Sequence, residues 1–246
     1  ELAEHGVLEK YGVKVIGVNI DAIRRGEDRI IFKETMTGLG IKVPDSEAVY
    51  SVEDAEKIAA KLGYPVVVRP AYTMGGTGGG LVYNVEELRV VASRGISASL
   101  IGQILIEQSV EGWEELELEV VRDAKNQIIT VCFIENVDAM GVHTGDSYCT
   151  APMLTIAPEL QKQLEIYSHR IVEAIQVIGG TNIQFAHNPD TGEIVVIEIN
   201  PRTSRSSALA SKATGFPIAQ VSSKLAAGLT LDEIPYWRDG TLEKYT

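Results

Sequence analysis

The chain has 246 residues, of which 45% are hydrophobic, and its 22 basic and 34 acidic side chains give a formal net charge of −12. This length and composition allow one large domain or two modest lobes, each with an apolar core. The acidic balance argues against a broad electrostatic surface for nucleic acid. The acidic balance does not exclude the binding of a single nucleotide, because a few arginines in a cleft determine the local electrostatic potential.

No apolar run approaches the roughly 20 residues of a membrane span, and residues 1–5 have neither the basic nor the apolar region of a signal peptide. The sequence therefore predicts a soluble, cytoplasmic protein with no membrane partner. Cys132 and Cys149 form no Cys-x-x-Cys pair, so we expect two buried cysteines rather than a disulfide framework or a zinc site.

The chain begins with a predicted short helix and a lone strand over residues 13–18, as if a sheet were entered partway. Its first residue is glutamate, and we expect the chain to be a fragment of a longer polypeptide. Apolar positions over residues 27–39 predict a helix that ends at Gly40. A second helix is predicted over residues 52–62, with Ser51 as its N-cap.

A glycine-rich loop, residues 73–80, lies between two strand-like runs, residues 66–69 and 81–83, which predicts a hairpin. Glycine lets a ligand approach the backbone closely, so the loop is typical of a flap over a polar group such as phosphate. A hairpin tip that binds nothing is the alternative. The loop is neither a P-loop nor a dinucleotide fingerprint, because Leu81 stands where the first needs lysine and the second needs glycine.

Asn84 is the predicted N-cap of a helix over residues 86–94, and residues 104–106 predict a short buried strand. This alternation of strands and helices through residue 108 predicts a compact α+β lobe. Strict alternation of polar and apolar residues over 115–120 then predicts a half-buried antiparallel strand.

Pro158 begins a long amphipathic helix that we expect to close at residues 179–180, which are both glycine. Two strands are predicted after it, over residues 182–186 and 194–199, joined by a turn rich in Pro, Asp and Gly. The tail from Ser206 onward is predicted to be helical.

Oxygen-bearing side chains gather on these last two strands. Glu198 and Asn200 are two residues apart and share one face, and Gln184 on the preceding strand can lie beside them. Carboxylate and amide oxygens, completed by phosphate, suit Mg²⁺ better than zinc. The alternative is an ordinary polar strand face exposed to solvent.

Arginines flank this patch and the glycine loop. Arg202 and Arg205 follow the last strand, and their guanidinium groups match a carboxylate-like or phosphate oxyanion. Arg69 ends the strand before the glycine loop and Arg29 lies on an early helix, so both could reach phosphate, although Arg29 could equally be a surface charge. His143 lies in a second loop of small residues and is expected to face a ligand. No motif for a covalent nucleophile is present.

Taken in order, these segments resemble the ATP-grasp domain in the amino-terminal half of carbamoyl-phosphate synthetase large subunits. The resemblance runs from about residue 27 to the end and rests on four long strings, residues 69–80, 135–147, 182–186 and 197–217. It implies an α+β ATP-grasp fold in which ATP lies between two α+β lobes.

The resemblance also implies that the chain consists of three parts. Residues 1–26 would be a remnant of a Rossmann-like pre-ATP-grasp domain. Residues 27–108 would form the small lobe with its glycine-rich flap, and residues 109–246 the large lobe with the metal and bicarbonate site.

The site residues implied by the resemblance fall into four groups. Phosphate contacts would come from Arg29, Arg69, Gly75 and Gly76, and further nucleotide contacts from Gln108, Val110, Glu115, Gly141, Val142, His143, Gln184 and Glu198. Two Mg²⁺ or Mn²⁺ ions would be held by Gln184, Glu198 and Asn200. A K⁺ ion would lie at Asn136, Asp138, Ala139, Val142 and Ser147. The catalytic residues would be Arg202, which holds bicarbonate, with Arg205 and Asn200. Gln108 departs from the family pattern, since it stands where a glutamate is expected.

The resemblance implies an ATP-dependent ligase that phosphorylates bicarbonate to carboxyphosphate, which ammonia then converts to carbamate. This would be part of carbamoyl phosphate synthesis for arginine and pyrimidine biosynthesis. The expected partners are the rest of the large subunit and a glutaminase small subunit. Two alternatives are another ATP-grasp carboxylate ligase of the biotin carboxylase kind and a nucleotide-binding scaffold without activity.

Overall fold

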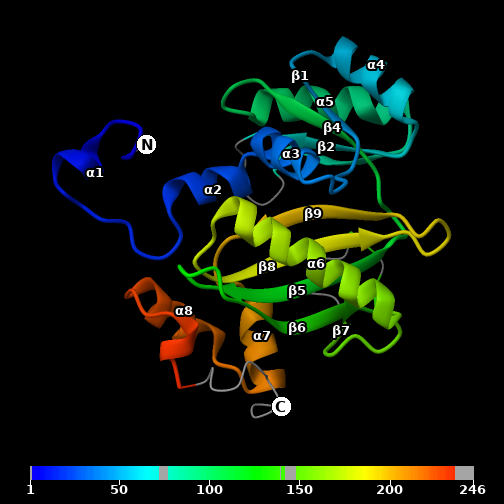
Figure 1. Ribbon diagram of the computed structural model, residues 1–246. Coiled ribbons are helices and arrows are strands. Elements are labelled where there is room, and N and C mark those ends of the chain that lie inside the picture. The colour runs from blue at the N-terminus through cyan, green and yellow to red at the C-terminus, as the bar shows by residue number, and fades with distance from the viewer. Residues whose placement is uncertain (1, 72–76, 139, 142–147, 236–246) are drawn as a thin grey trace. The chain divides into compact units, whose positions relative to one another are not determined.

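The computed structural model describes residues 2–71, 77–138, 140–141 and 148–235 (Figure 1). The chain divides into two compact units, a large unit of Glu1–Val43 and Gly112–Thr246 and a small unit of Pro44–Glu111. Each unit has its own antiparallel sheet and its own apolar core. No helix within the described ranges is both long and apolar enough to cross a membrane.

The small unit is a four-stranded sheet in the order β1-β4-β2-β3, with two helices packed on one face. Its elements are β1 (Ser46–Val49), α4 (Val52–Leu62), β2 (Val66–Pro70), β3 (Gly80–Val82), α5 (Val85–Ala98) and β4 (Ile104–Gln108). Alternate strand residues such as Val66, Val68 and Ile106 point to the same face. There they meet Ala59 of α4 and Leu88 of α5 in one core.

Local sequence signals begin both helices of the small unit. The Ser51 side chain accepts a hydrogen bond from the backbone N–H of Asp54 (3.1 Å). The Asn84 side chain accepts one from the backbone N–H of Glu87 (2.9 Å). Both predicted N-caps are therefore confirmed, since each side chain satisfies an N–H that the first helical turn leaves without a partner.

The predicted hairpin is confirmed as well, because β2 and β3 pair antiparallel with Val66 opposite Val82. At the described base of the loop, Gly78 has a φ of +83°, and a Cβ atom there would lie 2.8 Å from the Cβ of Ala98 in α5. Glycine is therefore required at this position both by the backbone conformation and by the close approach to the helix.

The large unit is built on a five-stranded antiparallel sheet in the order β7-β6-β5-β8-β9 (Figure 1). The strands are β5 (Glu114–Arg122), β6 (Ile128–Asn136), β7 (Cys149–Thr150), β8 (Gly179–His187) and β9 (Ile194–Asn200). The helices are α1 (Val7–Lys10), α2 (Ile20–Glu27), α3 (Arg29–Gly38), α6 (Pro158–Ile175), α7 (Arg205–Thr214) and α8 (Ile218–Ala226), followed by the 3-10 helix η1 (Leu231–Glu233).

The two faces of this sheet pack against different helices. Leu116 and Leu118 of β5 point to the face that α2, α3 and α6 cover, and they belong to a core with Phe32 and Ile171. Val121 belongs to a second core, built with residues of α7 and α8. Both faces of β5 are therefore buried, although the alternation in its sequence predicted a half-buried strand.

Two predicted elements at the start of the chain are corrected. Residues 13–18 form no strand, and the side chains of Val13 and Ile16 are exposed. No strand within the described part of the chain pairs with this segment, and a strand without a neighbour gains no ladder hydrogen bonds. Residues 27–43, predicted in the lobe that ends at residue 108, belong instead to the large unit, because Phe32 and Met36 enter its core.

Helix α6 also ends earlier than predicted. It stops at Ile175, and Gln176 caps it with a left-handed backbone at φ 64°, donating its N–H to the carbonyl groups of Val172 and Glu173. The glycines at 179 and 180, predicted to close the helix, instead begin β8. The Cβ of a side chain at Gly180 would lie 2.7 Å from Ile218, so glycine there serves packing against α8.

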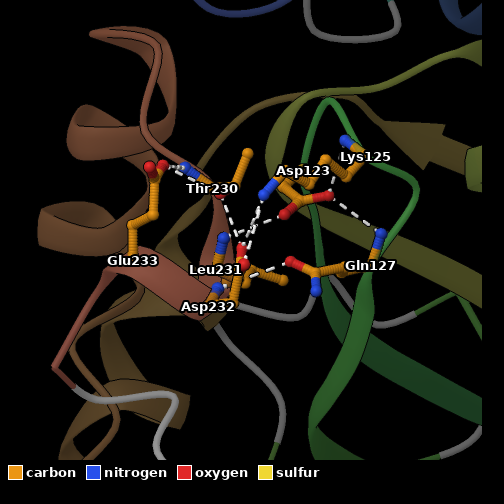
Figure 2. Close-up of polar contacts among 7 residues, drawn as sticks. All are labelled: Asp123, Lys125, Gln127, Thr230, Leu231, Asp232 and Glu233. Carbon is orange, nitrogen blue, oxygen red and sulfur yellow. Dashed lines mark hydrogen bonds and ion pairs between the residues drawn. The ribbon is translucent and has the colours of Figure 1, made fainter.

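The end of the described chain is tied to the turn between β5 and β6 (Figure 2). The buried carboxylate of Asp123 accepts hydrogen bonds from the N–H groups of Lys125 (2.9 Å) and Leu231 (2.8 Å). Lys125 forms an ion pair with Asp232 at 3.1 Å, and the Thr230 hydroxyl donates to Asp232 at 2.6 Å. These contacts, which we call the C-terminal latch, hold η1 against the sheet.

Candidate functional site

One face of the large unit's sheet carries polar side chains on three adjacent strands. On each of these strands, residues of the core beneath α6, such as Leu118, Ile183 and Ile199, alternate with residues that point to the opposite face. Strand pairing arranges six of them in two rows, Glu117–Gln184–Glu198 and Glu119–Asn182–Asn200. We call these six residues the polar face.

A β-bulge brings Glu198 to this face. Gln184 is opposite Glu198 while Phe185 is opposite Val196, so Ile197 is an extra residue in β9. Without it, Glu198 would follow Val196 toward the apolar core. The bulge therefore reverses the alternation and points the carboxylate to the same side as Gln184.

The residues predicted to bind metal lie close together. The Asn200 side chain donates its Nδ2 to Oε1 of Glu198 at 3.1 Å, and Gln184 is the direct cross-strand neighbour of Glu198. Arg202 donates from its guanidinium to Oδ1 of Asn200 at 3.3 Å and is itself exposed. The predicted proximity is thus confirmed by the strand register, while the role of these side chains as ligands stays a prediction.

Behind this set is a buried carboxylate that the sequence analysis did not single out. Glu119 has no exposed surface and accepts hydrogen bonds from Ser206 (2.6 Å), Ser207 (2.7 Å), Ser204 (3.2 Å) and Asn182 (3.1 Å). Burial raises the pKa of Glu119, and the hydrogen bonds from Ser206, Ser207 and Asn182 oppose that rise.

Glu117, also fully buried, links the polar face to the next strand. Its Oε1 accepts from Nδ2 of Asn136 at 3.0 Å and its Oε2 from Nδ2 of Asn182 at 2.8 Å. Asn136 belongs to the predicted K⁺ set together with Asp138, whose carboxylate accepts from the N–H of Tyr148 at 2.7 Å. Ala139, Val142 and Ser147, the rest of that set, lie outside the described residues.

In the small unit, two predicted nucleotide contacts lie in the same sheet. Arg69 donates its Nε to Oε1 of Glu107 at 2.9 Å, and this carboxylate is buried. Gln108 ends β4 and exchanges hydrogen bonds with the backbone of Asp45, donating its N–H at 2.7 Å. Val110 follows in the segment after β4 and is half-buried.

The remaining predicted residues are spread over several elements. Arg29 is the first residue of α3 and Arg205 the first of α7, and both side chains are exposed. Glu115 is buried in β5, opposite Ala186. Gly141 is exposed, with a φ of +114°. Gly75, Gly76, Val142 and His143 lie outside the described residues.

The donor chemistry of the polar face fits a hard divalent cation together with phosphate. Within the described ranges no three His, Cys, Asp or Glu side chains gather as a metal centre. The set of Gln184, Glu198 and Asn200 offers one carboxylate and two amide oxygens, and Mg²⁺ is usually bound by one or two carboxylates plus substrate phosphates and water. These residues therefore suit a metal that arrives with a nucleotide.

Comparison with known structures gives the class of the fold. A biotin carboxylase from Campylobacter jejuni, solved as a complex with β,γ-ATP, superimposes with a TM-score of 0.80 at 21% identity, over 94% of this chain and 52% of that one. A biotin carboxylase domain of the Hydrogenobacter thermophilus 2-oxoglutarate carboxylase gives a TM-score of 0.77 at 23% identity, over 93% and 52%. The chain has the ATP-grasp fold, as predicted.

Sequence comparison gives the family. Residues 28–234 match the model described as carbamoyl-phosphate synthase L chain, ATP binding domain. The carbamoyl phosphate synthase large chain of Archaeoglobus fulgidus is 56% identical over 96% of this chain and 22% of that protein. The N-terminal section of the large chain from Aquifex aeolicus is 54% identical over 95% of this chain and 42% of that protein. The chain belongs to the family of carbamoyl-phosphate synthase large-chain ATP-binding domains, and it spans about a fifth of the full-length large chains it matches.

Proposed function

We propose that the polar face holds Mg²⁺ or Mn²⁺ with ATP and that Arg202 holds bicarbonate beside them, for the formation of carboxyphosphate. The observation that supports this most directly is the contact series from Gln184 to Arg202. One carboxylate, two amides and one guanidinium follow each other from β8 to the end of β9, with Asn200 hydrogen-bonded to Glu198 and Arg202 hydrogen-bonded to Asn200.

The proposed reaction is a phosphoryl transfer. An oxygen of bicarbonate attacks the γ-phosphorus of ATP, the bond from phosphorus to the bridging oxygen breaks, and ADP leaves. The metal ions, when bound, neutralise the phosphate oxygens. Arg202 and Arg205 orient the bicarbonate, since a guanidinium fork matches a carboxylate-like anion, and the protein acts mainly by alignment and charge stabilisation.

Other contacts implied by the resemblance belong to the same proposal. Arg29, Arg69 and the glycine loop would contact phosphates, Gln108 and Val110 the adenine, and Glu115 the ribose. A K⁺ ion would lie near Asn136 and Asp138. These assignments rest on the family resemblance.

The later steps concern the whole protein. We propose that ammonia, supplied by a glutaminase small subunit, attacks the carbonyl carbon of carboxyphosphate to give carbamate and phosphate. The rest of the large chain would then complete carbamoyl phosphate, for arginine and pyrimidine biosynthesis in the cytoplasm. The large chains similar to this one are several times longer, which supports a division of these steps among several domains.

The experiment is ATP hydrolysis by the whole protein with and without bicarbonate, first in the absence of biotin and then with biotin or another carboxylic acid added. We expect bicarbonate to stimulate hydrolysis. ATP hydrolysis that requires biotin or another carboxylic acid as a substrate would favour the alternative of another carboxylate ligase of the biotin carboxylase kind. Binding of ATP without turnover in any of these mixtures would favour the scaffold alternative.

A further inference from the structure

We propose that Glu119 is a positioning residue that fixes the connection between β9 and α7, the segment that carries Arg202 and presents Arg205. This inference rests on the proposed function for the role of the two arginines. It adds a residue that touches neither proposed substrate and acts through its hydrogen-bond partners.

The partners of Glu119 come from two different elements. Ser204 is the N-cap of α7, and Ser206 and Ser207 lie in the first turn of that helix. Their hydroxyl groups donate to Glu119 at 3.2, 2.6 and 2.7 Å, so the start of α7 is bonded to the middle strand of the sheet. Asn182 of β8 donates to the same carboxylate at 3.1 Å.

The other end of the connection is fixed to the sheet through Asn200. The Thr181 hydroxyl donates to the Asn200 carbonyl at 2.6 Å, and the N–H of Arg202 donates to the same carbonyl at 2.7 Å. The chain thus leaves β9 in one defined direction. Since only residues 201–204 separate the strand from α7, holding Ser204 and the first turn restricts where Arg202 and Arg205 can lie.

Asn182 gives Glu119 a second route to the site. Its Nδ2 is shared among Glu117 (2.8 Å), Glu119 and Ser206 (3.1 Å), which leaves its Oδ1 turned to Asn200 at 3.5 Å. The two buried carboxylates therefore determine the orientation of the Asn182 amide. That orientation presents an acceptor, not a donor, to the side chain of Asn200.

A carboxylate suits this role better than an amide. It offers two acceptor oxygens with about four lone-pair sites, and a glutamine offers one oxygen and two N–H donors. The positive end of a helix dipole also favours a negative group at the start of α7. Glu119→Gln keeps the shape of the side chain but puts an NH₂ group in place of one oxygen, either Oε1, which accepts from Ser204, Ser206 and Asn182, or Oε2, which accepts from Ser207.

The experiment compares Glu119→Gln with Asp123→Asn. Asp123 is a matched control, because it is also a fully buried carboxylate, directly after β5, and it accepts hydrogen bonds from the N–H groups of Lys125 and Gln127 in the turn and of Leu231 in the C-terminal latch (Figure 2). Two readouts are taken: the KM for bicarbonate in the whole protein, and hydrogen exchange of backbone amides along the chain.

For Glu119→Gln we expect the KM for bicarbonate to rise about tenfold, as for other residues that orient ligand side chains, with faster exchange over residues 201–210. For Asp123→Asn we expect faster exchange over residues 229–234 and an unchanged KM. An unchanged KM in Glu119→Gln, or an equal rise in the control, would overturn the inference. The second outcome would mean general destabilisation.

Ser207→Ala covers the case in which Glu119→Gln does not fold. It removes a single donor to Glu119 and should raise the KM for bicarbonate by a smaller factor. An unchanged KM in this variant would overturn the inference. Where Glu119→Gln does fold, the effects of Glu119→Gln and Ser207→Ala on the KM should be less than additive in the double variant, because both changes remove the same contact.

The two proposals can fail separately. If the unmodified protein shows no bicarbonate-dependent hydrolysis, the proposed function fails. The exchange data then still decide whether Glu119 holds the connection, since unchanged exchange over residues 201–210 in Glu119→Gln contradicts it.

Discussion

At the scale of single residues, Glu198 is the carboxylate on which the proposed metal site depends. Glu198→Gln keeps the size of the side chain and removes its charge, so we expect bicarbonate-dependent ATP hydrolysis by the whole protein to fall by about 100-fold or more. Steady-state release of ADP measures this. Thermal unfolding should change little, since Glu198 is only half-buried.

Glu193→Gln is the matched control for that change. It alters a glutamate in the hairpin between β8 and β9, where Glu193 forms an exposed ion pair with Lys42 at 2.7 Å. Exposed ion pairs contribute little to the stability of a protein. Turnover should therefore stay near that of the unmodified protein, and wild-type turnover in Glu198→Gln would contradict the metal assignment.

Gly78 gives a prediction about stability. Gly78→Ala forces a Cβ to within 2.8 Å of Ala98 at a backbone with φ +83°, and we expect it to lower the free energy of unfolding by about 1–3 kcal/mol. Gly38→Ala is the control, because a Cβ at this position in α3 meets nothing within 4 Å. It should raise stability by about 0.5 kcal/mol. Urea unfolding of both variants measures the difference, and equal effects would contradict the packing at Gly78.

Some site residues could be predicted from the sequence and others could not. Glu198 and Asn200 were predictable as neighbours, because period-two alternation puts residues two apart on one face. Glu119 was not, since alternation over residues 115–120 indicates a polar face without indicating what covers it. The hydroxyl groups of Ser206 and Ser207 cover it, and their spacing in the sequence is also that of an ordinary helix start.

At the scale of elements, the starts of helices were more predictable than the end of α6 or the first strand, because local side-chain chemistry marks a helix start. The side chains of Ser51 and Asn84 cap their helices as expected. The predicted end of α6 was wrong, because Gln176 adopts the left-handed conformation that glycine usually takes at a helix end. The strand over residues 13–18 was also wrong, since an apolar run forms a strand only where a neighbour supplies hydrogen bonds.

The C-terminal latch should weaken in acid. Hydrogen bonds from the Thr230 hydroxyl and from Lys125 lower the pKa of Asp232, and hydrogen bonds from Thr230 lower that of Glu233. A carboxyl whose folded-state pKa is lowered stabilises the fold fully above its ordinary pKa. That contribution is lost as the pH falls through the lowered value.

Thr230→Val tests this prediction, because it removes the hydroxyl and keeps the shape. We expect its melting temperature to lie below that of the unmodified protein at neutral pH. The gap should narrow as the pH falls below about 4, where the carboxyls become protonated. Melting curves between pH 3 and 7 measure it, and a gap that is constant or wider in acid would contradict the account.

At the scale of the whole molecule, two units with separate sheets carry different parts of the proposed chemistry. The α+β class and the ATP-grasp fold were predictable, because long strings such as residues 182–186 and 197–217 are far more specific than a short motif. The assignment of residues 27–43 was not. Nothing in the local pattern of α3 indicates which of two cores Phe32 and Met36 enter.

The central claim, that bicarbonate attacks the γ-phosphate of ATP at the polar face, is tested most directly by the fate of bicarbonate oxygen. The whole protein is given ATP and ¹⁸O-labelled bicarbonate in unlabelled water, and the phosphate released is analysed by mass spectrometry. If carboxyphosphate forms and is then cleaved at its carbon, the attacking oxygen stays with phosphorus, and we predict phosphate that carries one ¹⁸O atom. Phosphate without label, at a normal rate of hydrolysis, would show that water attacks ATP directly and would contradict the account.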